Sequence, residues 1–347
     1  MRRSIQNTIA TDFSAFEHLR PIRSALVMLV VLSVTCIRHD LRALLPLGIG
    51  LLFAAVADRG MSLRRRVVSM MGAAISVTIG AALGSLVSAN TTLHVVVGGL
   101  ATFVYGVIGV TGLTAMTAGV LGLVVFTVFA GSPIELLDWR TNTVLMLLGT
   151  VIMIGSAAIE IGIRRIIRGP QPVMGEDQAS TLWSRLVSGI RLDDPFVRHG
   201  IRLAIVMMIA IALEEILAFP HSYWIPMTVA WISRPDRDGT VDKVTSRVIG
   251  TLLGVAIAGL LIGLTPASKA ESMLMVALAA YVVLAFLGPN YAVAVSGVTV
   301  FVFFLFHVVG YPLNGSIQAR TASTVIAAAL VLVAVGLGRL RSADPAS

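Results

Sequence analysis

The chain consists almost entirely of long apolar runs separated by short polar turns. Twelve runs can be traced, at about 22–37, 41–57, 67–88, 93–109, 112–130, 142–162, 199–218, 219–233, 245–264, 271–287, 291–309 and 321–338. A helix needs roughly 20 apolar residues to cross the hydrocarbon core of a membrane, where every backbone polar group must be satisfied internally. The pattern therefore predicts an all-α polytopic membrane protein with about 12 transmembrane helices.

The composition agrees with a membrane protein and leaves no room for a sizeable soluble domain. Hydrophobic residues make up 56% of the 347 residues and charged residues 13%, against about 25% charged in soluble domains. The net charge of +8 does not indicate a nucleic-acid partner, because the basic residues fall in short clusters between apolar runs. The single cysteine, Cys36, cannot form an internal disulfide.

The positions of lysine and arginine predict the orientation. With the N-terminus inside, all but five of these residues fall on the cytoplasmic side, the exceptions being Arg38, Arg42, Arg140, Lys269 and Arg320. Cytoplasmic loops carry an excess of positive charge, so both termini are predicted to be cytoplasmic.

Landmarks recur along the chain at an offset of 179 or 180 residues. They are Arg23 and Arg202, Pro46 and Pro226, Gly131 and Gly310, and Arg140 and Arg320. The offset predicts two six-helix repeats, residues 1–168 and 198–347, and the even number of spans makes them parallel. A cytoplasmic linker, 169–197, joins them, and its 181–192 segment has the spacing of either an interfacial helix or an ordinary packed helix. Duplicated membrane chains are most often transporters.

Two runs at matching positions are short and contain proline. They are 41–57, with Pro46, and 219–233, with Pro220 and Pro226. Broken helices free backbone dipoles for a substrate, so both runs are candidates for a transport site. The alternative is that proline only kinks a helix for packing.

Three arginines are candidates for binding an anion. Arg23 and Arg202 sit at the inner start of the first span of each half, where an arginine can anchor in lipid headgroups or hold a carboxylate. Arg320 is predicted to begin the last span from the outer side, like Arg140. It would suit an anion exit or serve as a helix-end anchor.

A second set of ionisable residues could couple transport to protons. Glu214 and Glu215 lie near the outer end of the seventh span, and His307 lies within an apolar run. An intramembrane ionisable group is a functional candidate, although the glutamates could also face water and the histidine could bond a backbone carbonyl. No metal cluster, catalytic constellation or ATP-binding loop is recognisable, so no enzyme activity, metal or cofactor is expected.

A longer motif follows in the second half. Tyr223-Trp224-Ile225-Pro226 precedes Arg234-Pro235-Asp236-Arg237, and Arg247-Val248-Ile249-Gly250-Thr251-Leu252-Leu253-Gly254 completes it. This segment resembles the signature of the fusaric-acid-resistance-like (FUSC) family, also called aromatic acid exporters. The first half keeps a degenerate copy, with Pro46, Asp58, Arg66 and Gly72.

The resemblance implies a bacterial inner-membrane protein that moves organic anions, with aromatic carboxylates as the substrate class. It carries Tyr223, Trp224, Pro226, Asp236, Arg237 and Arg247 over as pathway residues. We therefore expect a transporter that exports organic anions, driven by the proton gradient. A passive anion channel and a non-transporting membrane scaffold are the alternatives. The expected partners are the lipid bilayer and the substrate, and a homo-oligomer or a periplasmic adaptor subunit is compatible with the sequence.

Overall fold

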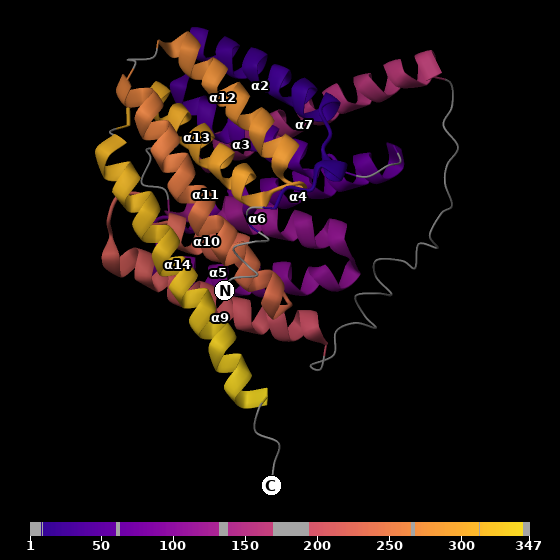
Figure 1. Cartoon of the computed structure of the whole chain (residues 1–347). Helices are drawn as coiled ribbons and strands as arrows, with labels where there is room; N and C mark the ends of the chain where they lie inside the picture. The colour runs from indigo at the N-terminus through magenta and orange to yellow at the C-terminus, as the bar shows by residue number, and fades with distance from the viewer. Residues whose placement is uncertain are drawn as a thin grey trace.

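A computed structural model describes residues 8, 10–59, 63–131, 138–168, 194–264, 268–311 and 313–342, and they form helices joined by short turns (Figure 1). The first half contains η1 (Phe13–Ala15), α2 (Leu19–Ile37), η2 (Leu41–Ala43), α3 (Leu44–Ala57), α4 (Leu63–Val87), α5 (Thr91–Val107), η3 (Ile108–Thr111), α6 (Leu113–Gly131) and α7 (Trp139–Arg168). The second half contains α9 (Pro195–Leu217), α10 (Trp224–Ile232), α11 (Arg237–Leu264), α12 (Lys269–Phe286), α13 (Tyr291–Val309) and α14 (Leu313–Ser342). The expected linker helix at 181–192 lies outside the described residues.

The all-helical membrane fold is confirmed for the described residues, whose α-helices fall on the expected apolar runs. Nine of the described helices are long and apolar enough to cross a membrane. The others are α9, which carries two charged residues near each end, and the short helices α3 and α10. At about 1.5 Å per residue, α3 and α10 are about 21 and 14 Å long, against about 30 Å of hydrocarbon. Twelve full spans therefore stay a prediction.

The helices differ in how much of their surface is buried, and the most buried ones form the core. In α6 and α13, 67% and 72% of the spanning window is buried, whereas in α7 and α11 the share is 28%. The long helices α6 and α13 are thus central, and the outer helices expose apolar side chains such as Val30, Val151 and Leu260. An exposed apolar surface of this kind suits contact with lipid.

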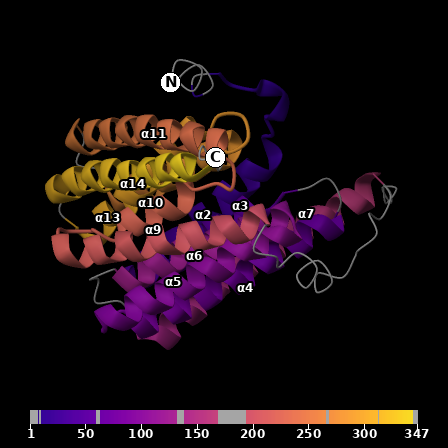
Figure 2. The same ribbon diagram turned by 90° about the horizontal axis from the view of Figure 1, so that it is seen from below.

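Helices at matching positions pack in matching pairs. In the first half α4 packs on α6 and α3 on α7, and in the second half α11 packs on α13 and α10 on α14. Across the halves, α5 packs on α9 and α12 on α2. Figure 2 shows α11, α13 and α14 on one side and α4, α5 and α6 on the other, with α9 and α10 between them. Two parallel repeats would produce these pairs, and the repeat itself remains an inference.

Glycines allow the closest of these approaches. A Cβ atom added at Gly80 of α4 would overlap the carbonyl oxygen of Gly122 in α6, and one at Gly250 of α11 would overlap that of Ala292 in α13. Only a residue without a side chain lets the backbones come this close. The central pairs are therefore fixed by small residues.

The two prolines lie elsewhere in their helices than expected. Pro46 is the third residue of α3, and Pro226 is the third residue of α10. In a first turn the missing N–H has no intrahelical partner to lose, so proline is tolerated there without a kink. The prolines therefore start two short helices and do not interrupt longer ones.

Candidate functional site

The short helix α10 is the centre of the candidate site. All of its residues except Trp231 are buried, and Tyr223, which directly precedes it, is buried as well. The chain reaches α10 through a turn in which His221 has a left-handed backbone (φ 61°). With nine residues, α10 is much shorter than a membrane span, and its burial places it in the interior of the helix bundle.

An aromatic cluster surrounds the first turn of α10. The His221 ring stacks on those of Trp224 and Phe306, with centroids 4.8 and 4.9 Å apart. Trp224 and Phe306 are also stacked, at 6.0 Å. Tyr311 packs against Phe306 with centroids 5.4 Å apart. Side chains from the α9–α10 turn, α10 and α13 thus form one aromatic wall.

Arg320 of α14 faces this wall from within the protein. Its guanidinium carbon lies 4.9 Å from the centroid of the Trp224 ring, and only 1% of the residue is exposed. Its two terminal nitrogens have no hydrogen-bond partner. The expectation that Arg320 begins its helix is wrong, because α14 starts at Leu313 and places Arg320 about two turns inside. Arg140 is exposed in the first turn of α7, so the two arginines have different environments.

Arg247 of α11 is placed similarly at the other end of α10. It is 2% exposed, and its guanidinium carbon lies 6.0 Å from the centroid of the Trp231 ring. Its Nε and one terminal nitrogen have no partner. Arg247 and Arg320 are close enough to interact electrostatically. Two buried guanidinium groups therefore line α10, one near each end.

Further cations gather next to Arg247. Lys243 lies one turn before it on α11, with Nζ 3.2 Å from the centroid of the Tyr291 ring. Lys243 is within electrostatic range of Arg59, Arg234 and Arg247. Among the described residues, no carboxylate forms an ion pair with Arg247 or Arg320. A buried charge without a partner costs several kcal/mol, so this arrangement suits an anion that arrives from outside the chain.

The turn between α10 and α11 has mainly structural contacts. Arg202 donates to the carbonyl oxygens of Arg234 (2.9 Å) and Pro235 (3.5 Å), which holds this turn against α9. The Asp236 carboxylate accepts the Gly239 N–H at 2.6 Å and caps the start of α11. The side chain of Arg237 lies outside the described ones. Of the expected pathway residues in this region, Arg202 and Asp236 thus position the backbone.

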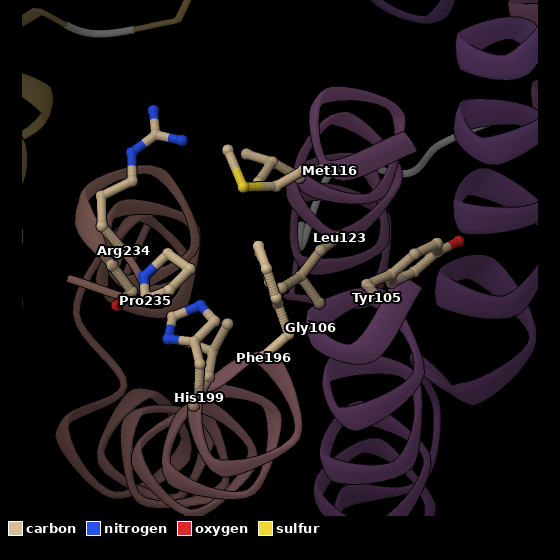
Figure 3. A pocket seen from close by; sticks show the side chains of 11 residues that line it. Tyr105, Gly106, Met116, Leu123, Phe196, His199, Arg234 and Pro235 are labelled. Carbon is tan, nitrogen blue, oxygen red and sulfur yellow. The ribbon is translucent and has the colours of Figure 1, made fainter. Parts of the chain in front are cut away.

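A small, mostly apolar cavity lies beside this turn (Figure 3). The lining residues that Figure 3 labels are Tyr105, Gly106, Met116, Leu123, Phe196, His199, Arg234 and Pro235. The His199 ring points into the cavity, whereas the Tyr105 hydroxyl points away and donates to the Ser76 carbonyl oxygen at 3.3 Å. Neither Arg247 nor Arg320 lines the cavity, so it is separate from the arginine pair.

Arg23 has a very different environment from that of Arg247 and Arg320. It donates to the carboxylates of Asp58, at 2.6 Å, and Glu160. Arg66 binds the same two carboxylates, at 2.7 and 3.1 Å. Arg164 completes the network with a 2.7 Å contact to Glu160. Burial acts to raise the pKa of Asp58, but hydrogen bonds from Arg66 and Arg23 outweigh burial and lower the pKa. In the first half, therefore, the buried arginines are neutralised by carboxylates.

The three candidate proton carriers lie apart from one another. Glu214 is 4% exposed, packs beside Gly131 and Tyr223, and leaves one carboxylate oxygen without a partner. Glu215 is 3.2 Å from His94 and accepts a hydrogen bond from Thr91. His307 is half-buried in the last turn of α13. Of the three, Glu214 packs beside Tyr223, which directly precedes α10.

Sequence reasoning missed several residues of the site. Lys243 could have been found, because it is four residues before Arg247 and hence on the same face of α11. His221 and Phe306 have no local signal, since their stacking depends on how the α9–α10 turn meets α13. Asp58 and Arg66 were recognised only as part of the degenerate motif.

Comparison with known proteins identifies a family that part of the second half resembles. Residues 208–334 match the family described as fusaric acid resistance protein-like. The match covers 127 of the 347 residues, so it is this part of the chain that is similar to the family. The matched segment begins within α9 and ends within α14, so it includes α10, Arg247 and Arg320. The FUSC resemblance is confirmed for this segment, and the described residues form a multi-pass helical membrane protein.

Relatives occur in several bacteria. A Haemophilus influenzae protein is 30% identical over 150 residues, which are 43% of this chain and 21% of that protein. A Synechocystis protein, slr1298, is 29% identical over 151 residues, 43% of this chain and 20% of its own length. The Escherichia coli inner membrane protein YccS is 28% identical over 156 residues, 45% of this chain and 22% of YccS. The matched part thus spans about a fifth of these relatives. No solved structure matches the chain.

Proposed function

We propose that this FUSC protein transports organic anions along α10, from Arg247 to Arg320. The single observation that carries the proposal is the pair of buried guanidinium groups without a carboxylate partner. Arginine stays charged in a protein interior, so each group retains an unmet demand for a negative charge. A mobile carboxylate would meet that demand without neutralising the site permanently.

The cations next to Arg247 suggest where an anion enters. Lys243, Arg59 and Arg234 lie within electrostatic range of one another at the predicted cytoplasmic end of α11. A group of like charges in a low-dielectric setting raises the local concentration of anions. Passage from this group to Arg247 and then to Arg320 would give export. The orientation rests on the distribution of lysine and arginine, with both termini cytoplasmic.

The aromatic wall supports an aromatic or hydrophobic carboxylate as the substrate. Trp224, Phe306 and His221 offer ring faces beside the Arg320 guanidinium. A substrate ring could stack on this wall while its carboxylate binds the arginine through two hydrogen bonds. Tyr223, next to Glu214, would line the same route.

We further propose that Glu214 couples anion transport to proton movement. Its carboxyl is buried beside Tyr223 with one oxygen unpartnered, and a group in this position can exchange a proton as the anion passes. Without such coupling the same arginine pair would serve a passive anion channel. We place the protein in the bacterial inner membrane, in agreement with the name of the E. coli relative. A homo-oligomer or an adaptor subunit stays a prediction.

Flux measurements on the purified full chain in proteoliposomes test the proposal. Labelled benzoate would be the probe, with Arg320→Gln and Arg247→Gln as variants and Arg140→Gln as the matched control, because Arg140 is an exposed arginine. Losing a charge-assisted hydrogen bond costs about 1.5–3 kcal/mol, so flux should fall about 10- to 100-fold in the first two variants. The control should keep its flux.

Two outcomes would contradict transport by this route. Equal flux in Arg320→Gln and Arg140→Gln would remove the arginine pair from the pathway. No flux of any aromatic carboxylate through correctly folded protein would favour a non-transporting scaffold. A protonophore separates the remaining two mechanisms, because uphill accumulation that it abolishes requires a carrier and excludes a channel.

A further inference from the structure

The segment before α2 lies against the second half of the chain. The Asn290 side-chain nitrogen is 3.0 Å from the Thr8 carbonyl oxygen and 3.2 Å from the Thr11 hydroxyl. The Asp12 N–H donates to the Pro289 carbonyl oxygen at 3.1 Å. Figure 2 shows this indigo segment beside the end of the second-half helices. It therefore binds the turn between α12 and α13, far from it in sequence.

The same segment reaches the beginning of the arginine route. The Thr8 hydroxyl lies 3.1 Å from that of Ser246, in a buried contact. Ser246 directly precedes Arg247, and Asn290 directly precedes Tyr291, whose ring lies under the Lys243 ammonium. Thr8 therefore covers the chain at the point where the cation group meets Arg247.

The contacts that Asp12, Phe16 and His18 make with the second half are less buried than those of Thr8. The Phe16 ring packs edge-on against Phe286, with centroids 5.1 Å apart, and the His18 Nδ1 lies 3.0 Å from the Tyr281 hydroxyl. Both His18 and its contact with Tyr281 are exposed to solvent. Segments with few buried contacts and exposed hydrogen bonds open locally at low cost. The segment can thus leave without rearranging α11 or α13.

We propose that Thr8 and residues 10–18 form a removable plug over the inner entrance of the arginine route. When the plug is seated, Thr8 and Ser246 close the approach to Arg247, and when it is released, anions reach Lys243 and Arg247. The proposal rests on the proposed anion route for its effect on flux. The seating itself can be measured independently of transport.

A cysteine at Ser246 reports the state of the plug. The test uses the full chain with Cys36→Ala, which removes the sole cysteine, together with Ser246→Cys and a membrane-impermeant maleimide applied to the predicted cytoplasmic face. Asn290→Asp keeps the oxygen that caps α13 at the Val293 N–H but removes the donor to Thr8. Phe16→Ala removes the ring contact. Glu17→Ala is the control, because the described ion pair of Glu17 is with Arg20 at the start of α2 and not with the second half.

Asn290→Asp and Phe16→Ala should each raise the maleimide labelling rate at least fivefold, and Glu17→Ala should not. Benzoate flux should also rise in Asn290→Asp and in Phe16→Ala when each is made in a chain that keeps Ser246. In a Thr8→Cys, Ser246→Cys pair, oxidation should stop flux and a reductant should restore it. Labelling rates that are equal in all variants would overturn the plug. Faster labelling with no benzoate flux in any variant would keep the plug and overturn the proposed anion route.

Discussion

The buried arginines fall into two chemical classes that substitution should separate. Arg320 is buried without a carboxylate, whereas Arg66 binds Asp58 and Glu160. An unpaired buried charge is costly, so replacing it by an apolar side chain of similar size should stabilise the protein, whereas breaking a buried pair costs about 3–5 kcal/mol. Arg320→Met should therefore raise the thermal midpoint in detergent while benzoate flux is lost, and Arg66→Met should lower it. A lower midpoint for Arg320→Met would indicate that the guanidinium is paired in solution.

Which arginine belongs to which class could not be read from the sequence. Arg23 and Arg202 look equivalent at their offset, but Arg23 joins a carboxylate network and Arg202 binds backbone carbonyl groups. The resemblance to the FUSC signature did lead to Arg247, Tyr223 and Trp224, and aromatic and basic residues close together suit an anion. Whether a carboxylate faces each arginine depends on contacts between helices far apart in sequence, such as that of α2 with α7.

Single glycines determine how closely the central helices approach. Helix α11 contains one glycine at such a contact and another that faces open space. Gly250 of α11 faces the Ala292 carbonyl oxygen, whereas a Cβ added at Gly263 of the same helix would meet nothing within 4 Å. Gly250→Ala should push α11 from α13 and destabilise the protein by about 1–3 kcal/mol. Gly263→Ala should be neutral or stabilising by up to about 1 kcal/mol, since alanine favours a helix. Thermal unfolding in detergent measures both, and equal midpoints would contradict the close α11–α13 contact.

Helix positions could be predicted well, and helix ends could not. The apolar runs located α2 to α14 because length and hydrophobicity are local properties of the chain. Pro46 and Pro226 indicated the two unusual elements correctly but suggested interrupted spans, whereas each proline lies in the first turn of a short helix. The start of α14 at Leu313 was missed because Gln318 and Arg320 lower the local hydropathy, although burial makes Arg320 part of the helix.

Across the whole molecule, the two halves share their packing pattern and differ in charge. The first half joins α2, α4 and α7 to the end of α3 through Arg23, Arg66, Glu160 and Asp58. Because the pKa of Asp58 is lowered in the folded state, its contribution to stability is complete above the ordinary value of about 3.9 and is lost as pH falls through the lowered value. The thermal midpoint of the wild type should drop below about pH 4, and this drop should be smaller in Asp58→Asn. A wild-type drop that begins near pH 6 would point to another group.

Because the pKa of Asp58 is lowered, protons that would drive the proposed transport near neutral pH must bind elsewhere, and Glu214 is the proposed group. Glu214→Gln keeps the shape of the side chain and cannot exchange a proton, so an imposed pH gradient should no longer drive uphill benzoate accumulation, although downhill flux through Arg247 and Arg320 should persist. Glu215→Gln is the matched control, as the next carboxylate along α9, bound to His94. Vesicles with and without a pH gradient give both readings. Gradient-driven accumulation that survives in Glu214→Gln would remove Glu214 from the coupling mechanism, and accumulation absent from the wild type would leave the arginine pair as the pathway of a passive channel.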